Sequence, residues 1–212
     1  MLFFLSEDMK SNKRVDDTYT NQARKEWYVA RSVYKLEEID KKYGLLHDQV
    51  RVVVDVGAAP GSRLQYLSHR LAERPGANII GFDIKPIQIS LPAVTTYLQD
   101  ITDREGVRQA LAASAVIPWE VDMLVSDMAP DTIGMSDIDA MRSIWLVEKI
   151  LWMCDELVRD DGSCVIKVFM WPWFDELVRH CKQTRWAKRV VVYKPKACRP
   201  GSKETYIVRR PG

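Results

Sequence analysis

Four charged residues that are far apart in the chain could meet in one site once the chain folds: Lys35, Asp127, Lys167 and Glu204. The last three lie at or near the ends of apolar runs that are typical of strands, and Lys35 lies on an expected helix. A glycine-rich turn, residues 55–61, follows another such run. Lysine and carboxylate side chains can accept a proton from a hydroxyl and orient it. A cofactor turn together with this set indicates methyl transfer onto a ribose hydroxyl.

Length and composition bound the class of protein. The 212 residues are expected to form one domain, 1–212, in which residues 1–20 are polar and loosely ordered. With 47% hydrophobic and 28% charged residues, the chain has a globular composition rather than a disordered one. No apolar run reaches transmembrane length, and the apolar start is too short for a secretory signal. We expect a cytoplasmic monomer without a membrane partner; a mitochondrial or nucleolar location stays open if the source is eukaryotic.

Basic residues are concentrated towards the end of the chain, although the net charge is only +2. Residues 177–203 contain no Asp or Glu but nine Lys or Arg: Arg179, Lys182, Arg185, Lys188, Arg189, Lys194, Lys196, Arg199 and Lys203. Such a field attracts polyanions, but a solvated basic face fits the pattern equally well. The four cysteines form no CxxC pair, so we expect free thiols and no metal site.

Hydrophobic periodicity predicts alternating strands and helices. Strands are expected at 50–56, 78–84, 94–98, 121–126, 163–169, 189–193 and 205–208. Helices are expected at 21–43, 62–73, 103–114, 137–158 and 172–183. This alternation predicts an α/β fold with a mainly parallel sheet covered on both faces. The last two strands have no helix between them and are expected to be antiparallel.

The ends of the first three expected strands carry groups that could bind a cofactor. Gly57 and Gly61 allow close approach of the backbone, but the turn lacks the G-x-G-x-x-G pattern of dinucleotide sites. Asp83 could accept both hydroxyls of a cofactor ribose, and Asp100 could accept from an adenine amino group. Each aspartate could instead cap a turn or helix. In register with the two glycines, they favour S-adenosylmethionine as the cofactor.

The ends of the later strands carry groups that could do chemistry. Lys167 lies inside an apolar run, where burying a cation is costly unless it is paired. Asp127, at the end of the neighbouring expected strand, is a natural partner, and the pair could be structural, catalytic or both. Glu204 opens the last strand, which is expected to insert near the strand of Lys167. A lone helical lysine such as Lys35 is most often solvent-exposed.

Several motifs in order give the chain a specific resemblance. They lie at residues 31–39, 54–61, 126–130, 165–169 and 199–208. From about Tyr19 onward, the chain resembles the FtsJ/RrmJ family of RNA 2′-O-ribose methyltransferases. The resemblance implies a Rossmann-like, class I S-adenosylmethionine-dependent fold, with a mostly parallel seven-stranded sheet and one antiparallel strand. It also implies that the substrate is RNA, specifically a uridine of ribosomal RNA in the large ribosomal subunit.

The resemblance also assigns roles. The family's Lys-Asp-Lys-Glu tetrad falls on Lys35, Asp127, Lys167 and Glu204. Lys167 is the candidate proton acceptor, oriented by Asp127, while Lys35 and Glu204 would position the ribose and its adjoining phosphate. This chemistry requires no metal. The candidate cofactor-binding residues are Gly57, Ala58, Pro60, Gly61, Ser62, Arg63, Asp83, Asp100 and Asp127.

The chain departs from the family pattern in two places. After Gly61 we would expect a second glycine and a tryptophan, but the chain has Ser62 and Arg63, and Arg63 could reach the methionine carboxylate of the cofactor. After the fifth expected strand come Trp171 and Trp173, which could stack on flanking bases or pack on the core.

The sequence is compatible with other functions. The substrate could be transfer RNA or an mRNA cap, and the tryptophans could form a slot for a methylguanine. The chain could also be a non-catalytic ribosome-assembly factor with the same fold, although an intact tetrad argues against this. A nicotinamide dehydrogenase is disfavoured by the Ala-Pro sequence in the glycine turn.

Overall fold

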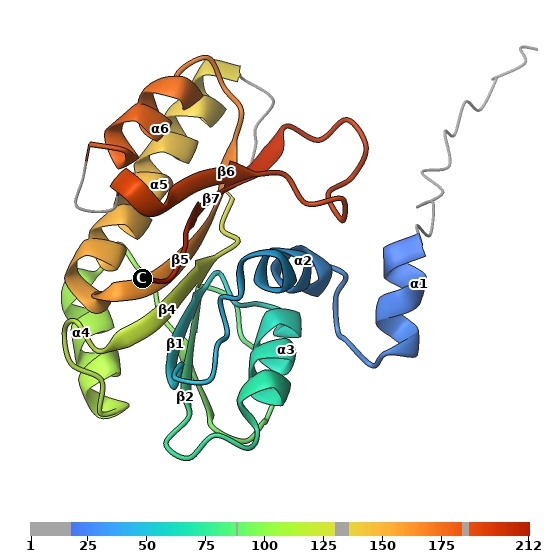
Figure 1. The fold of residues 1–212 in the computed structure, drawn as a ribbon, viewed down its shortest axis with the longest axis vertical. Helices are drawn as coiled ribbons and strands as arrows, with labels where there is room; N and C mark the ends of the chain where they lie inside the picture. Colours follow the sequence, from blue (N-terminus) through green and yellow to red (C-terminus); the bar gives the residue numbers. More distant parts are fainter. Residues whose placement is uncertain (1–17, 88, 130–135, 184–186) are drawn as a thin grey trace, which may run out of the picture.

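The computed structural model contains a seven-stranded sheet with helices on both faces (Figure 1). It describes residues 18–87, 89–129, 136–183 and 187–212, with the backbone alone at 136–140 and 187. The strands are β1 (Val52–Val56), β2 (Asn78–Asp83), β3 (Val94–Leu98), β4 (Val121–Ser126), β5 (Val158–Phe169), β6 (Val190–Tyr193) and β7 (Glu204–Arg209). The helices are α1 (Thr18–Lys25), α2 (Val33–Tyr43), α3 (Ser62–Leu71), α4 (Arg104–Ala113), α5 (Ser136–Leu157), α6 (Phe174–Cys181) and the short 3₁₀ helix η1 (Ala187–Arg189).

The strand order confirms the α/β, Rossmann-like prediction. The order is β3-β2-β1-β4-β5-β7-β6. Strands β1 to β5 pair in parallel, whereas β7 is antiparallel to both of its neighbours, β5 and β6. The sheet grows in opposite directions from β1 and β4, so a crevice forms at the carboxyl ends of these two strands. The glycine turn follows β1, and Asp127 follows β4.

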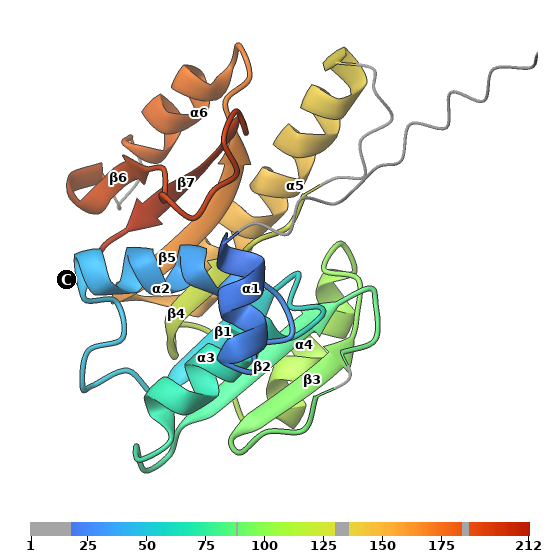
Figure 2. The same ribbon diagram turned by 90° about the vertical axis from the view of Figure 1, so that its right-hand side faces the viewer.

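Two apolar layers hold the helices to the sheet. On one face, α4, α5 and α6 pack through residues such as Val107, Ile150 and Leu177. On the other face, α2 and α3 pack through residues such as Ile39 and Leu67. Figure 2 looks onto this second face, with α1 and α2 in front of the sheet. Both faces of the central strands are thereby buried, which explains why β1 and β4 are nearly continuous apolar runs.

The helix predicted over residues 21–43 is wrong as a single element. The structure has two helices, α1 and α2, and the chain between them reverses at Trp27, which has a φ of +62°. Gln65 of α3 holds this connection: its side chain accepts from the Val29 amide (2.9 Å) and donates to the Trp27 carbonyl (3.0 Å). A contact with a distant helix therefore overrides the local helical pattern. The predicted loose segment also ends earlier, because α1 begins at Thr18.

The fifth strand is longer than predicted. Residues 161–162 suggest a turn, but β5 runs without interruption from Val158, and its register against β4 shifts between Val121 and Met123. The other predicted elements agree with the observed bounds to within two residues. The four cysteines are buried free thiols, as expected. Residues 1–17, Pro130 and Arg185 lie outside the described part of the chain, within which no helix is long and apolar enough to cross a membrane.

Candidate active site

The glycine turn closes tightly over the end of β1. Gly57 and Gly61 have φ values of +71° and +116°, which side chains with a Cβ rarely adopt. The amides of Gly57 and Ala58 both donate to the Phe82 carbonyl, at 2.9 and 3.0 Å. A Cβ at Gly57 would lie 2.6 Å from Met128 Cγ. The turn therefore requires glycine both for its backbone conformation and for its close contact with the end of β4.

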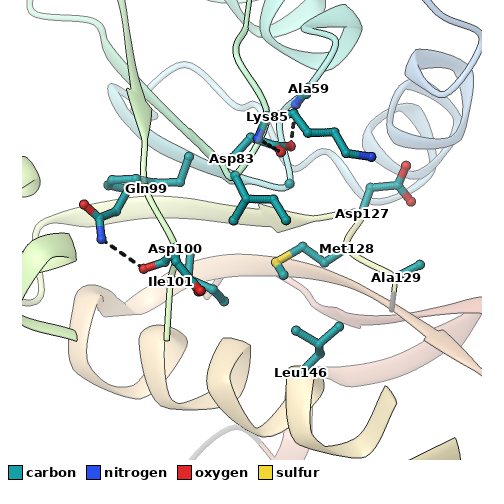
Figure 3. Close-up of a pocket in the computed structure, with 13 residues that line it drawn as sticks. Ala59, Asp83, Lys85, Gln99, Asp100, Ile101, Asp127, Met128, Ala129 and Leu146 are labelled. Carbon is teal, nitrogen blue, oxygen red and sulfur yellow. Dashed lines mark hydrogen bonds between the residues drawn. The ribbon is translucent and has the colours of Figure 1, made fainter. Parts of the chain in front are cut away.

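A cavity of about 300 Å³ opens beside this turn (Figure 3). Its lining residues are Gly57, Ala59, Phe82, Asp83, Ile84, Lys85, Gln99, Asp100, Ile101, Asp127, Met128, Ala129 and Leu146. Figure 3 shows Asp83 on one side and Met128 and Leu146 on the other. The three aspartates follow or end β2, β3 and β4, so the cavity lies in the crevice that the strand order predicts.

Asp83 and Asp100 each support the local backbone and also line the cavity. Asp83 Oδ2 accepts from the Ala59 amide and Oδ1 from the Lys85 amide, both at 2.8 Å. Asp100 Oδ1 accepts from the Thr102 amide at 2.8 Å. Each carboxylate oxygen has a second lone pair that can accept from a ligand. The capping role and the ligand-binding role are therefore compatible at both positions.

The remaining cofactor candidates lie outside the cavity lining. Ala58, Gly61, Ser62 and Arg63 are buried, and Pro60 is exposed. Arg63 is 4% exposed, and its guanidinium points into the protein. This geometry does not support the expectation that Arg63 reaches a cofactor carboxylate, because the side chain is already held by protein acceptors. The direction of a long side chain depends on what packs around it, which the sequence alone does not show.

The four residues of the expected tetrad lie together as two ion pairs. Lys35 Nζ lies 2.5 Å from Glu204 Oε1, and Lys167 Nζ lies 3.1 Å from Asp127 Oδ1. Lys167 also donates to the Asp127 backbone carbonyl. The side chains of all four are between 9% and 13% exposed. Asp127 also lines the cavity beside the glycine turn, so the two ion pairs and the cavity adjoin one another.

Tyr206 joins the two ion pairs, and it is not among the site residues predicted from the sequence. Its hydroxyl lies 2.9 Å from Asp127 Oδ1 and 2.7 Å from Glu204 Oε1. Burial, followed by the charges of Asp127 and Glu204, raises the pKa of Tyr206 well above its usual value. The hydroxyl therefore keeps its proton and serves as a donor. Its position was readable in principle, because alternate residues of β7 point to the same side.

Helix α2 is held so that Lys35 meets Glu204. Asp40, buried in α2, accepts from Tyr66 Oη at 2.6 Å and from Arg70 Nη1 at 2.5 Å, and both partners belong to α3. Glu38, also in α2, accepts from the amides of Lys196 (3.0 Å) and Ala197 (3.2 Å) in the loop before β7. These bonds fix α2 against both α3 and the loop before β7.

The charges around Asp127 keep it ionised. Burial alone would raise the pKa of Asp127, but Lys167, Arg63 and Lys35, together with the hydrogen bond from Tyr206, lower it to about 2. The carboxylate is thus an anion at any physiological pH. It presents a fixed negative charge at the boundary between the cavity and the two lysines.

The two tryptophans that follow β5 have different surroundings. Trp173 packs against the apolar core beside α5 and α6. The ammonium of Lys203 lies over Trp171, 4.9 Å from the centroid of the indole ring.

A second cavity of about 250 Å³ is lined by Arg31, Ser32, Lys35, Arg199, Ser202 and Glu204. It shares Lys35 and Glu204 with the tetrad, and its other charged groups are cationic.

The chain is similar to known methyltransferases in sequence and in fold. A family model described as FtsJ-like methyltransferase matches residues 28–211. Ribosomal RNA large subunit methyltransferase E of Legionella pneumophila (strain Paris) is 38% identical over 207 residues, which cover 95% of this chain and 96% of that protein. The protein with the same name from Hydrogenovibrio crunogenus is 34% identical over 92% of this chain and 91% of its own length. The crystal structure of a ribosomal RNA methyltransferase from Plasmodium falciparum has a TM-score of 0.73, with 25% identity, 87% coverage of this chain and 98% of that one.

Proposed function

The chain belongs to the FtsJ-like methyltransferase family, and from this premise we propose that it methylates the 2′-hydroxyl of a ribose in RNA, using S-adenosylmethionine. The substrate we propose is a uridine of ribosomal RNA in the large ribosomal subunit, because the relatives at 34–38% identity carry the name of a large-subunit ribosomal RNA methyltransferase. The observation that carries the proposal is that Lys35, Asp127, Lys167 and Glu204 meet beside the cavity of the glycine turn.

The cavity has the chemistry that S-adenosylmethionine requires. Carboxylates at Asp83 and Asp100 can accept from ribose hydroxyls and from an adenine amino group. Phe82, Ile101 and Met128 supply apolar walls for a flat ring. When bound, the cofactor supplies an electrophilic methyl group on a sulfonium centre. Asp127 lies on the side of the cavity that faces the lysines, where a negative charge favours a cationic ligand.

The four residues of the tetrad have different roles at the acceptor hydroxyl. Lys167, in its neutral form, accepts the 2′-hydroxyl proton on Nζ. The Asp127 carboxylate then stabilises the resulting ammonium, since its Oδ1 lies 3.1 Å away. The pair of Lys35 and Glu204 holds the ribose and its neighbouring phosphate in line with the donor. Alignment of this kind can supply about 7–11 kcal/mol of the barrier.

The second cavity supports an RNA substrate. Arg31 and Arg199 line it next to Lys35, and burial together with the nearby charge of Arg199 lowers the pKa of Arg31. Cations that repel one another are stabilised by an anion placed between them. A phosphodiester of the RNA substrate is the anion that we assign to this position.

Tritium transfer from labelled S-adenosylmethionine tests the proposal. The substrates are large ribosomal subunits, transfer RNA and capped RNA, all prepared from cells that lack the protein. The same three substrates prepared from wild-type cells, in which the site is already methylated, are the controls. We expect label in large-subunit RNA, at a site that resists alkaline cleavage because its 2′-oxygen is methylated. Label found only in transfer RNA or only in the cap would show that this RNA, and not large-subunit ribosomal RNA, is the substrate. No transfer to any RNA, despite binding to ribosomal subunits, would support an assembly factor instead.

A further inference from the structure

Arg63 connects the glycine turn to the catalytic strand end. Its Nε and Nη2 donate to Asp55 Oδ1, at 3.0 and 2.8 Å. Nη2 also donates to the Gly57 carbonyl at 2.5 Å, and Nη1 donates to Asp127 Oδ2 at 3.2 Å. Four of its five N–H groups are thus directed at acceptors on the carboxyl ends of β1 and β4. The side chain is 4% exposed, so these bonds are made in an environment that excludes water.

The two oxygens of Asp127 have separate partners. Oδ2 receives Arg63, while Oδ1 lies near both Lys167 Nζ (3.1 Å) and the Tyr206 hydroxyl (2.9 Å). A carboxylate bonded through one oxygen alone can rotate about its Cβ–Cγ bond. The bond from Arg63 to the second oxygen opposes that rotation and keeps Oδ1 directed at Lys167.

Asp55 explains why the guanidinium stays in this position. Asp55 is fully buried in β1, and Arg63 is its ion-pair partner at 2.8 Å. Burial raises the pKa of Asp55 to about 6, against the opposing effect of Arg63. A buried carboxylate is strongly destabilising without a cation. The chain therefore contains a buried network in which one cation serves two carboxylates, Asp55 as its anchor and Asp127 as the residue it orients.

We propose that Arg63 is a positioning residue for methyl transfer, which sets the orientation of Asp127 and, through it, of Lys167. The proposal rests on the proposed function, because it assigns Lys167 as the proton acceptor. Arg63 occupies the place where the family pattern leads us to expect tryptophan, so this network is a property of this chain's own sequence. Arg63 acts through Asp127 and needs no contact with cofactor or RNA.

The test separates orientation of Asp127 from simple neutralisation of Asp55. Four proteins are compared: wild type, Arg63→Met, Arg63→Lys and the double variant Asp55→Asn with Arg63→Met. The double variant removes both charges of the anchor pair, so it does not leave a carboxylate buried alone. For each we would measure the melting temperature, the Kd for S-adenosylmethionine by calorimetry, and kcat and KM for tritium transfer to RNA.

The expected result is a fall in kcat without loss of cofactor binding. Since hydrogen bonds to charged groups are the strong ones, Arg63→Met should lower kcat by roughly 10- to 100-fold while the cofactor Kd stays within about threefold. Arg63→Lys should recover part of the rate. The double variant should regain the melting temperature that Arg63→Met loses, but not the rate.

Recovery of kcat together with stability in the double variant would overturn the proposal, because Arg63 would then serve Asp55 alone. Wild-type kcat in Arg63→Met would overturn it as well. If Arg63→Met does not fold, the kcat of the double variant alone is compared with that of wild type. Failure of the proposed function is distinguishable, since the wild-type protein would then show no transfer in the same assay.

Discussion

Tyr206 lies directly opposite Lys167 in the antiparallel pair of β5 and β7. This register places Glu204 two residues away on β7, and the Tyr206 hydroxyl lies between Glu204 and Asp127. Through Lys35, helix α2 is thereby linked to Lys167 near the end of β5. The insertion of β7 beside β5 is the topological feature that makes this link.

Removing the Tyr206 hydroxyl should slow catalysis without unfolding the protein. Tyr206→Phe removes the single O–H donor that Asp127 and Glu204 share. A hydrogen bond to a charged group contributes about 1.5–3 kcal/mol, so we expect kcat to fall by at least about tenfold. Steady-state methyl transfer measures this. Tyr97→Phe is the matched control, because its hydroxyl bonds Ser114 away from the tetrad. Equal rates in the two variants would show that the bridge contributes nothing.

The glycine turn can be tested with a pair of matched substitutions. Gly57 and Gly76 have φ values of +71° and +76°, so alanine costs a similar backbone strain of about 1 kcal/mol at each. Only at Gly57 would the new Cβ meet another residue, Met128, while at Gly76 nothing lies within 4 Å. Gly57→Ala should therefore unfold at a lower urea concentration than Gly76→Ala and should bind S-adenosylmethionine more weakly. Identical behaviour of the two variants would contradict the close contact between the turn and β4.

Asp83 should contribute to cofactor affinity. It lines the cavity and ends β2, and its two oxygens have lone pairs left after bonding to the Ala59 and Lys85 amides. We expect Asp83→Ala to raise the cofactor Kd by roughly 10- to 100-fold in calorimetry, since a charged acceptor is lost. Asp48→Ala, at an exposed position before β1, controls for loss of charge. A Kd equal to that of the control would remove Asp83 from the binding site.

The strand ends were the predictable part of this site. Lys167 and Asp127 carry charges at the ends of apolar runs, and parallel pairing brings such ends to one edge of the sheet. The same signal marks Asp55, a carboxylate inside the Val-rich β1, although Asp55 is not among the predicted site residues. Tyr206 follows from the alternation of side chains along β7, but only once Glu204 is placed.

Contacts between distant elements were not predictable. The inward direction of Arg63 depends on Asp127 lying within reach across two strand ends. The break between α1 and α2 depends on Gln65 of another helix. The early start of β5 depends on pairing between Val121 and Val158, which overrides the turn tendency of residues 161–162. In each case the deciding partner is remote in the chain.

Stability should depend on pH through Asp55. Its pKa is about 6 when folded, above the usual 3.8. The folded state therefore holds this proton more tightly, so the contribution to stability is complete below pH 4 and is lost as the pH rises through 6. At 1.36 kcal/mol per pKa unit, wild type should lose up to about 3 kcal/mol over this range relative to Asp55→Asn.

Urea denaturation of the two proteins at intervals from pH 4 to pH 7 measures this difference. The window avoids Asp127, whose lowered pKa of about 2 places its own contribution to stability above pH 4, with loss only at lower pH. Parallel curves for wild type and Asp55→Asn would contradict the assignment of Asp55 as the buried titrating group.

Single-turnover methyl transfer by Lys167→Ala tests the central claim most directly. If Lys167 accepts the ribose proton, the rate should fall by about 10²–10⁴-fold, while the Kd for S-adenosylmethionine should match that of wild type. Lys41→Ala, which removes an exposed lysine that pairs with Glu37 on the same helix, should keep the wild-type rate. Wild-type turnover in Lys167→Ala, with the protein folded and the cofactor bound, would contradict the proposed mechanism.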